Sequence, residues 1–321
     1  MTPLADIVTP GRHVAVVGPT ASGKSAVAMA LATHLGGAGA AEIVSVDSMQ
    51  VYRGMDIGTA KDSAEDRATI PHHLIDIVDP DEDYTVARFA QDVRISLADI
   101  EARGRRAILV GGTGLYLRAA VEDLEIPGRF EEVRAELELE PDVEALHRRL
   151  LELDPVAAAR MEPTNRRRIV RALEVTIGSG RAFSSYGPGL EAYPVSPIVL
   201  VGLRRSRDEL DRLIVARYQR QLAAGFVDEV RALAARPAGL SRTARQALGY
   251  RELLGHVEAG VPVDAALDAA ITRTRRFARR QERWFRRDPR IAWIDVDSGT
   301  DDGEVVSAVR ALVPELAPPR P

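Results

Sequence analysis

The sequence feature that most constrains the fold is a glycine-rich segment near the N-terminus. It comprises Gly18, Pro19, Thr20, Ala21, Ser22, Gly23, Lys24 and Ser25. This is a complete G-x-x-x-x-G-K-[ST] phosphate-binding pattern, which needs a strand before it and a helix after it. The apolar run 13–17 precedes the segment, and the helix-favouring run 25–35 follows it. The pattern therefore predicts a P-loop that joins a buried strand to a helix.

Each fixed position of this loop has a physical role. The glycines let successive backbone N–H groups point at phosphate oxygens, and the following helix adds its positive N-terminal end. Lys24 can reach an outer phosphate, while the Ser25 hydroxyl can bind Mg²⁺. Lys24 and Lys61 are the only lysines among 43 basic residues. An otherwise arginine-rich chain thus places a compact point charge inside the loop.

The rest of the chain alternates short apolar runs with helical patterns, which predicts an open parallel α/β sheet flanked by helices. The expected strands, besides 13–17, are 42–46, 106–110, 197–203 and 290–296. Two regions break the alternation. Residues 121–194 are rich in Glu, Arg and Leu at helical spacing, and residues 207–285 form a second helical run. We expect a P-loop core from 1–120 and 195–321, with a helical C-terminal part, and a helical insertion at 121–194.

Composition restricts the class of protein. The 321 residues contain no cysteine, which excludes disulfides, thiolate zinc sites and cysteine nucleophiles and is compatible with a reducing cytoplasm. No stretch is apolar enough to span a membrane, and residues 1–11 have no signal core. We expect a cytoplasmic enzyme that acts as a monomer, with no obligate protein partner.

Polar residues follow the second expected strand, where ligands bind in open α/β sheets. They are Asp47, Ser48, Met49 and Gln50. A single Asp more often caps a helix or turn, but this polar cluster favours a function. Its carboxylate could bind Mg²⁺ through water or act as a general base.

The next strand ends in Gly111 and Gly112, so the Walker-B carboxylate of ATP hydrolases is missing there. Thr113 follows and offers a hydroxyl at the mouth of the site. The adjacent pair His72 and His73 has no obvious third metal ligand, and we expect a structural loop there rather than zinc.

Two segments are rich in arginine. Residues 166–171 contain four arginines, which either form a solvated helix face or contact a polyanion; the single acid nearby favours the polyanion. Residues 273–290 contain nine arginines and two acids, interleaved with Phe277, Trp284 and Phe285. We expect these aromatic side chains inside and the arginines outside, a surface suited to RNA phosphates.

Eight motifs in order resemble the tRNA isopentenyltransferase family, the bacterial tRNA dimethylallyltransferases, over about residues 12–284. The motifs are 18–25, 47–52, 58–61, 71–76, 111–116, 168–174, 247–250 and Arg279-Arg280-Gln281-x-x-Trp284. The resemblance implies transfer of a dimethylallyl group from dimethylallyl diphosphate to N6 of adenine 37 in tRNA, with release of diphosphate.

The resemblance also implies roles for single residues. Asp47 would be the base, and Lys24, with Mg²⁺ on Ser25, would stabilise the diphosphate. Arg217, at the start of a helix over 217–225, would bind diphosphate, and Thr113 would lie near the target nucleotide. The anticodon stem-loop would contact Asp47, Ser48, Met49, Gln50, Thr113, Arg134, Arg167, Arg168, Arg171, Arg279, Arg280, Gln281 and Arg283.

Three other functions are compatible with parts of this pattern. A small-molecule kinase could use the same loop for ATP, and would turn over Mg-ATP without RNA. An adenylate isopentenyltransferase would act on free nucleotides, but it needs neither arginine-rich segment. An RNA-binding regulator with a degenerate site is disfavoured by the intact Lys24, Ser25 and Asp47.

Overall fold

The structure, a computed structural model, describes residues 2–187, 189–190 and 192–313. It divides into two compact units. One comprises Met1–Glu122 and Val195–Pro321, and the other comprises Asp123–Pro194. Each unit has its own apolar core.

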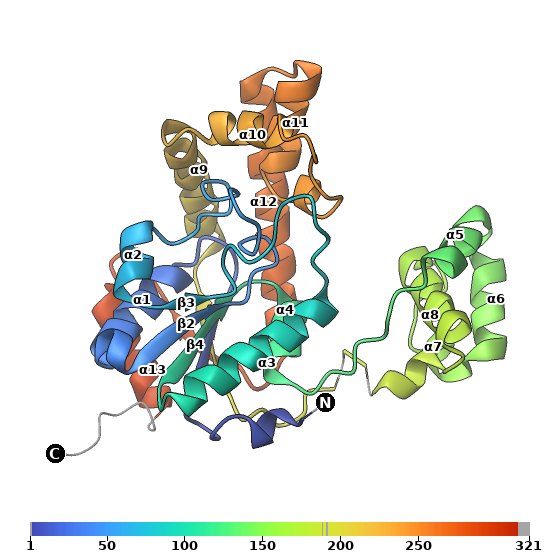
Figure 1. The fold of residues 1–321 in the computed structure, drawn as a ribbon, viewed down its shortest axis with the longest axis horizontal. Coiled ribbons are helices and arrows are strands. Elements are labelled where there is room, and N and C mark those ends of the chain that lie inside the picture. The colour runs from blue at the N-terminus through green and yellow to red at the C-terminus, as the bar shows by residue number, and fades with distance from the viewer. Residues whose placement is uncertain (1, 188, 191, 314–321) are drawn as a thin grey trace. The chain divides into compact units, whose positions relative to one another are not determined.

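The larger unit contains a six-stranded parallel sheet with strand order β3-β2-β4-β1-β5-β6 (Figure 1). Its strands are β1 (Val14–Val17), β2 (Ala41–Ser45), β3 (His72–His73), β4 (Arg106–Gly111), β5 (Val199–Arg204) and β6 (Ala292–Asp295). Val17 is paired with Gly111 on one side and with Gly202 on the other, so β1 and β4 end side by side while β5 continues for two more residues. The predicted open parallel sheet is confirmed, and each of the five predicted strands is found within two residues of its expected ends.

The strand β3 corrects one expectation, because we expected a loop at the histidine pair. His72 and His73 extend the sheet at its edge by pairing with Ile43 and Val44. A two-residue strand is too short to show any periodicity. The ring of His73 is held by the carboxylate of Glu42, with Nε2 and Oε2 2.5 Å apart.

Helices cover the sheet because its strands are apolar on both faces. The helices α1 (Lys24–His34) and α13 (Asp302–Leu312) share a core cluster with β1 and β5. The helices α3 (Val86–Ala102) and α4 (Gly114–Val121) meet through Phe89 and Tyr116, whose ring centroids are 4.6 Å apart. A short α2 (Ala64–Thr69) precedes β3, and single 3₁₀ turns occur at Leu4–Asp6, Gly37–Gly39, Phe183–Tyr186 and Ala244–Gln246.

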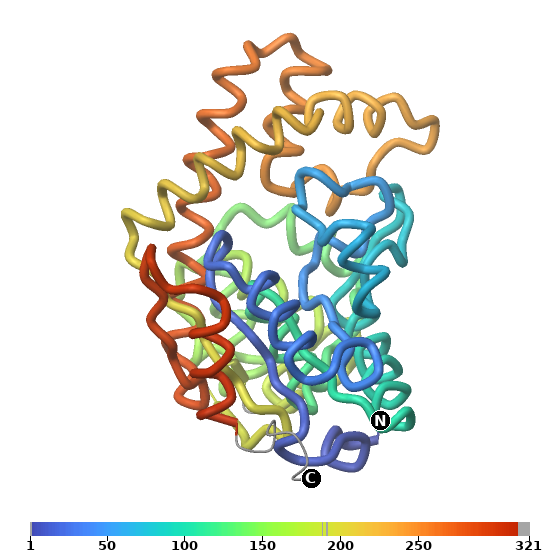
Figure 2. The backbone as a smooth tube through the Cα atoms, turned by 90° about the vertical axis from the view of Figure 1, so that its left-hand side faces the viewer, coloured from blue at the N-terminus to red at the C-terminus, as the bar shows by residue number. Residues whose placement is uncertain are grey.

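Four further helices of this unit gather at one end of the sheet, and the longest of them, α12, continues down to α4 (Figures 1 and 2). They are α9 (Arg207–Ala223), α10 (Phe226–Ala234), α11 (Tyr250–Ala259) and α12 (Val263–Phe285). The long α12 packs against both α9 and α11. The smaller unit contains α5 (Glu131–Leu139), α6 (Val143–Leu153), α7 (Pro155–Ala159) and α8 (Arg166–Ser179), which pack around Leu146, Leu150, Ile169 and Leu173.

A buried carboxylate near the start of β2 gives a testable stability contribution. The Glu42 side chain is 2% exposed and lies 2.8 Å from Arg103 Nη2 and 2.8 Å from Arg105 Nη1. These arginines and His73 outweigh the effect of burial and lower the pKa of Glu42 from 4.5 to about 2. A lowered carboxyl pKa stabilises the fold above the unfolded-state pKa, and this stabilisation is lost as pH falls toward the folded-state value.

We therefore expect Glu42→Gln to lower the free energy of unfolding by about 2–3 kcal/mol at pH 7, after allowance for the partly exposed arginines. The difference from the natural protein should shrink between pH 4.5 and pH 2. Urea unfolding of both proteins across this range measures it. Glu258→Gln, which removes an exposed carboxylate paired with Arg245, is the control and should change little. A difference that does not vary with pH would contradict the assignment.

Candidate active site

The phosphate-binding loop connects β1 to α1 in a backbone conformation that requires glycine at two positions. Gly18 has φ +150°, and a Cβ there would lie 2.7 Å from the Leu203 carbonyl oxygen. Gly23 has φ +94° and is the N-cap of α1. Lys24 follows directly, and its Nζ donates to the Pro19 carbonyl oxygen at 2.7 Å. The lysine is thereby folded back over the loop, where it can meet a bound phosphate.

Two cations and one carboxylate interact electrostatically beside this loop. Burial lowers the pKa of Lys24 to about 8; the Asp47 carboxylate opposes that decrease, and the Arg217 guanidinium adds to it. Burial also lowers the pKa of Arg217, again against the effect of Asp47. Desolvated cations held near each other are stabilised by an anion of two or more charges. The arrangement therefore favours a phosphate or diphosphate ligand.

Asp47 lies two residues beyond the end of β2. Its Oδ1 accepts a hydrogen bond from the Met49 backbone N–H at 2.8 Å, so the turn-capping interpretation holds for one oxygen. The same residue lines the cleft with Lys24. The carboxylate is thus oriented by the turn and also lies within the site.

The predicted site residues of five chain segments line one cleft of about 660 Å³. They are Thr20, Ala21, Gly23, Lys24, Ser25, Asp47, Ser48, Met49, Gln50, Thr113, Arg217, Arg280 and Gln281. Gly18, Pro19 and Ser22 belong to the loop but do not line the cleft. All residues that line the cleft belong to the larger unit.

Gln281 links the two glycine-rich turns. Its Oε1 accepts from the Thr20 backbone N–H at 2.9 Å, and its Nε2 donates to the Gly112 carbonyl oxygen at 2.8 Å. A Cβ at Gly114 would lie 2.2 Å from Nε1 of Trp284. The Arg-Arg-Gln-x-x-Trp motif of α12 therefore packs directly on the Gly111–Tyr116 turn, and these glycines leave room for its side chains.

The oxygen ligands in the cleft fit Mg²⁺ bound through a substrate. Among the residues that the structure describes, no group of three or more His, Cys, Asp and Glu is close enough to hold a metal ion. Ser25 and Asp47 nevertheless contribute a hydroxyl and a carboxylate to the same cleft. Magnesium commonly binds through one or two protein oxygens, with phosphate oxygens and water completing the octahedron. Ser25 would hold the ion, and it would neutralise charge on a bound diphosphate.

A family model described as IPP transferase matches residues 50–288. The chain belongs to the IPP transferase family. A tRNA dimethylallyltransferase of Kineococcus radiotolerans is 50% identical over 308 residues, 94% of this chain and 96% of that protein. The tRNA dimethylallyltransferase of Streptomyces coelicolor is 48% identical over 286 residues, 88% of this chain and 90% of that protein. The resemblance seen in the motifs is therefore confirmed.

Solved structures of similar proteins have the same fold. The tRNA isopentenylpyrophosphate transferase of Bacillus halodurans is 37% identical, with a TM-score of 0.68 over 95% of this chain and 97% of that chain. A eukaryotic dimethylallyltransferase acting on tRNA has a TM-score of 0.77 at 22% identity, over 96% of this chain and 81% of that chain, and supports the fold alone.

The position of Arg217 in this IPP transferase corrects a second expectation. Arg217 does not open a helix, because α9 begins ten residues earlier at Arg207. The Ser206 side chain accepts from the Glu209 N–H at 3.3 Å and caps that helix. Arg217 instead projects from within α9, donating from Nη1 to Thr20 Oγ1 at 3.0 Å and from Nη2 to the Gly58 carbonyl oxygen at 3.4 Å.

In the smaller unit, two of the predicted RNA-binding arginines are also structural. Arg171 Nη1 lies 2.6 Å from the fully buried Glu174, and Arg171 Nη2 donates to the Pro127 carbonyl oxygen at 2.8 Å. Arg134 Nε lies 2.9 Å from Glu138, and its Nη1 is 3.6 Å from Glu174. Arg167 and Arg168, by contrast, are exposed in the first turn of α8. Cations are unfavourable at a helix N-terminus, so this placement favours an anionic partner.

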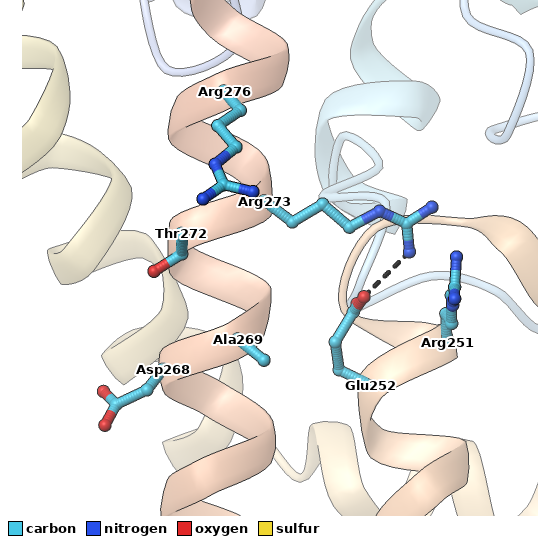
Figure 3. Close-up of a pocket in the computed structure, with 7 residues that line it drawn as sticks. All are labelled: Arg251, Glu252, Asp268, Ala269, Thr272, Arg273 and Arg276. Atoms are coloured by element: carbon cyan, nitrogen blue, oxygen red, sulfur yellow. Dashed lines mark hydrogen bonds and ion pairs between the residues drawn. The ribbon is translucent and has the colours of Figure 1, made fainter.

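A second cavity of about 480 Å³ lies between α11 and α12 (Figure 3). Arg273 reaches from α12 to Glu252 on α11, with Nη1 and Oε1 2.8 Å apart. Arg273 also lines the main cleft, so the two cavities adjoin. Arg251 and Arg276 are exposed here and increase the positive charge beside the cleft.

Several residues that build the cleft lie at positions without a recognisable sequence motif. Gln221, Glu229 and Arg205 bond to backbone groups of the P-loop or of the turn at 56–58. Tyr250 belongs to the 247–250 motif. Bonds to distant backbone atoms leave no spacing pattern in the sequence, so no local signal identified the first three.

Proposed function

We propose that this protein transfers a dimethylallyl group from dimethylallyl diphosphate to N6 of adenine 37 in tRNA. The observation that supports this most is the single cleft, which brings the Asp47 carboxylate together with Lys24 and Arg217. A diphosphate needs the two cations, and an amine nucleophile needs a proton acceptor. Relatives that carry the name tRNA dimethylallyltransferase support the same reaction.

The reaction proceeds by displacement at an allylic carbon. The adenine N6 forms a bond to C1 of the dimethylallyl group, and the C1–O bond breaks so that diphosphate leaves with the electron pair. Asp47 accepts the proton that N6 loses. Lys24, Arg217 and the loop N–H groups stabilise the charge that develops on the leaving diphosphate. Mg²⁺ held by Ser25, when bound, supplies additional charge neutralisation there.

RNA binding uses surfaces of both units. Arg280 lines the cleft, whereas Arg279 and Arg283 are exposed on α12 outside it. We propose that these side chains contact phosphates of the anticodon stem-loop while the target base leaves its stack and enters beside Asp47 and Thr113. Extrusion costs little in an already single-stranded loop. The other proposed RNA contacts are Ser48, Met49, Gln50, Arg134, Arg167, Arg168, Arg171 and Gln281.

The protein acts as a monomer in the cytoplasm in this proposal. No helix in the described ranges combines the length and the apolar composition needed to cross a lipid bilayer.

The first experiment is a transfer assay with purified protein, Mg²⁺ and radiolabelled dimethylallyl diphosphate. Unmodified tRNA and AMP are supplied as separate acceptors. Label in tRNA alone is the expected result. Label in AMP would assign the protein to the nucleotide-acting branch, and label in neither would contradict the proposal.

The arginines of α12 give a prediction specific to RNA. Arg279 is 52% exposed and 3.6 Å from Asp211, and Arg280 lies over the Phe277 ring at 5.6 Å. We expect replacement of both by Gln to raise the Kd for tRNA about 10-fold and to lower the salt slope of log Kd by about 1–2. The KM for dimethylallyl diphosphate should change little. Arg231→Gln, which removes an exposed surface arginine of α10, is the control. An unchanged salt slope would show that neither side chain contacts phosphate.

A further inference from the structure

One carboxylate organises the turn that forms a wall of the cleft. The turn consists of Asp56, Ile57 and Gly58, and Gly58 lines the cleft with Thr59 and Ala60. The Glu229 carboxylate of α10 accepts hydrogen bonds from three consecutive backbone N–H groups of this turn. Its Oε2 lies 2.9 Å from the Asp56 nitrogen and 2.7 Å from the Ile57 nitrogen, and its Oε1 lies 3.2 Å from the Gly58 nitrogen.

The position of Glu229 is itself determined by two neighbours. It lies in the first turn of α10, where the helix dipole favours a negative charge. The Tyr250 hydroxyl donates to Glu229 Oε1 at 2.5 Å. Burial and the adjacent Glu229 carboxylate both raise the pKa of Tyr250, so the hydroxyl stays protonated and acts as a donor.

Two aromatic rings pack against the other side of the turn and restrict its position. The rings of Phe226 and Tyr250 meet edge to face, with centroids 4.9 Å apart. A Cβ at Gly58 would lie 2.3 Å from Phe226 Cε2 and 2.4 Å from Tyr250 Cε2. The backbone at Gly58 therefore lies against both rings, which block movement of the turn toward them.

The Gly58 carbonyl oxygen connects the turn to the side of the cleft where diphosphate is proposed to bind. That oxygen accepts from Arg217 Nη2 at 3.4 Å and from Gln221 Nε2 at 3.1 Å. Gln221 Nε2 also donates to the Ile57 carbonyl oxygen at 2.7 Å. The other end of the Arg217 guanidinium donates to Thr20 Oγ1 of the P-loop at 3.0 Å. A continuous set of bonds thus runs from Glu229 through Gly58 and Arg217 to the P-loop.

We propose that Glu229 is a positioning residue for the diphosphate half of the reaction, and that it acts by holding Gly58 where its carbonyl oxygen orients Arg217. This inference rests on the proposed function. A carboxylate suits this place because both oxygens accept charge-assisted hydrogen bonds from three N–H groups and one hydroxyl. Glutamine offers only one accepting oxygen, which leaves part of the turn unsatisfied and lets Gly58 move.

The first test is Glu229→Gln, assayed with each substrate varied in turn. We expect the KM for dimethylallyl diphosphate to rise about 10-fold or more, because displacing a charged group by about 1 Å can cost up to 100-fold. The KM for tRNA should stay within about 2-fold, since the change acts on the diphosphate side. Tyr250→Phe, which keeps the ring packing and loses one hydrogen bond, should shift the same KM about 3-fold.

Asp228→Asn is the matched control. It removes the same charge from the neighbouring position of α10, where Asp228 is 79% exposed and pairs at the surface with Arg231. It should behave like the natural protein. Equal KM values for Glu229→Gln and Asp228→Asn would overturn the inference. A natural protein without transfer activity would instead overturn the proposed function, so the two failures are distinguishable.

A double-variant cycle separates positioning from general stability. Arg217→Gln, Glu229→Gln and the pair are compared by kcat/KM for dimethylallyl diphosphate and by competition with inorganic diphosphate. If Glu229 acts through Arg217, the double variant should match Arg217→Gln within about 2-fold. If the kcat/KM loss of the double variant equals the product of the two single losses, Glu229 supports the fold independently of Arg217, and the inference is overturned. Tyr250→Phe provides the same cycle if Glu229→Gln does not fold.

Discussion

Replacing Asp47 by asparagine is expected to lower kcat for transfer to tRNA by about 10²–10⁴-fold, the usual contribution of a general base. The amide has the size of the carboxylate, and its Oδ1 can still accept from the Met49 N–H, so the turn after β2 should persist. What is lost is the carboxylate that we propose as the acceptor of the N6 proton. Single-turnover assays, with enzyme and tRNA both in excess over dimethylallyl diphosphate, measure the chemical step directly.

The variant should also change how the enzyme responds to pH, because the Asp47 charge supports protonation of Lys24. Without it, the pKa of Lys24 falls further, and dimethylallyl diphosphate should bind more weakly at pH 8 than at pH 6.5. Asp79→Asn is the control, since Asp79 is 48% exposed and 3.3 Å from Arg53. An Asp47→Asn enzyme with normal kcat would restrict Asp47 to the turn-capping role and remove it from the chemistry.

The P-loop and the sheet could be predicted because their signals are local. Gly18–Ser25 has fixed spacing, and the strands are short apolar runs between helices. The cleft could be predicted because the carboxyl ends of parallel strands meet. That rule predicts Asp47 and Thr113 beside Lys24, and all three side chains line one cleft in the structure.

The contact between Glu229 and the turn at 56–58 could not be predicted in the same way. Glu229 binds backbone N–H groups more than 170 residues earlier, and any residue type other than proline supplies such a group. Its sequence neighbourhood, Phe226-Val227-Asp228-Glu229, is typical of an ordinary helix start with acids in the first turn. The tertiary arrangement alone distinguishes Glu229 from the exposed Asp228 beside it.

Arginine-rich segments are ambiguous for a related reason. The run at 166–171 predicts a polyanion partner, but the structure pairs Arg171 with the buried Glu174 and leaves Arg167 and Arg168 exposed. Sequence cannot separate these roles because Glu174 looks like another surface acid of α8. Burial of that carboxylate requires a cation nearby, whatever RNA is bound.

The second large effect is expected at Lys24. Lys24→Gln should lower kcat/KM for dimethylallyl diphosphate by about 10²–10³-fold, the loss typical for one donor to a developing oxyanion. Lys24 folds over the loop onto the Pro19 carbonyl oxygen. From there the ammonium can turn to the leaving diphosphate, whereas the neutral amide cannot compensate its charge. Steady-state kinetics with saturating tRNA, at pH 7 and in Mg²⁺, measure this loss.

The pH profile identifies the lysine as the group responsible. Because burial lowers the pKa of Lys24 to about 8, the free enzyme loses this charge as pH rises through 8. The KM for dimethylallyl diphosphate should therefore rise above that pH in the natural protein, and this limb should be absent in Lys24→Gln. Lys24→Arg is the matched comparison, since a guanidinium keeps its charge far above pH 8. The arginine variant should lose activity only because the larger guanidinium fits the loop poorly, and its KM for dimethylallyl diphosphate should not rise near pH 8. A limb that persists in both variants would assign the titration to another group and leave Lys24 charged throughout.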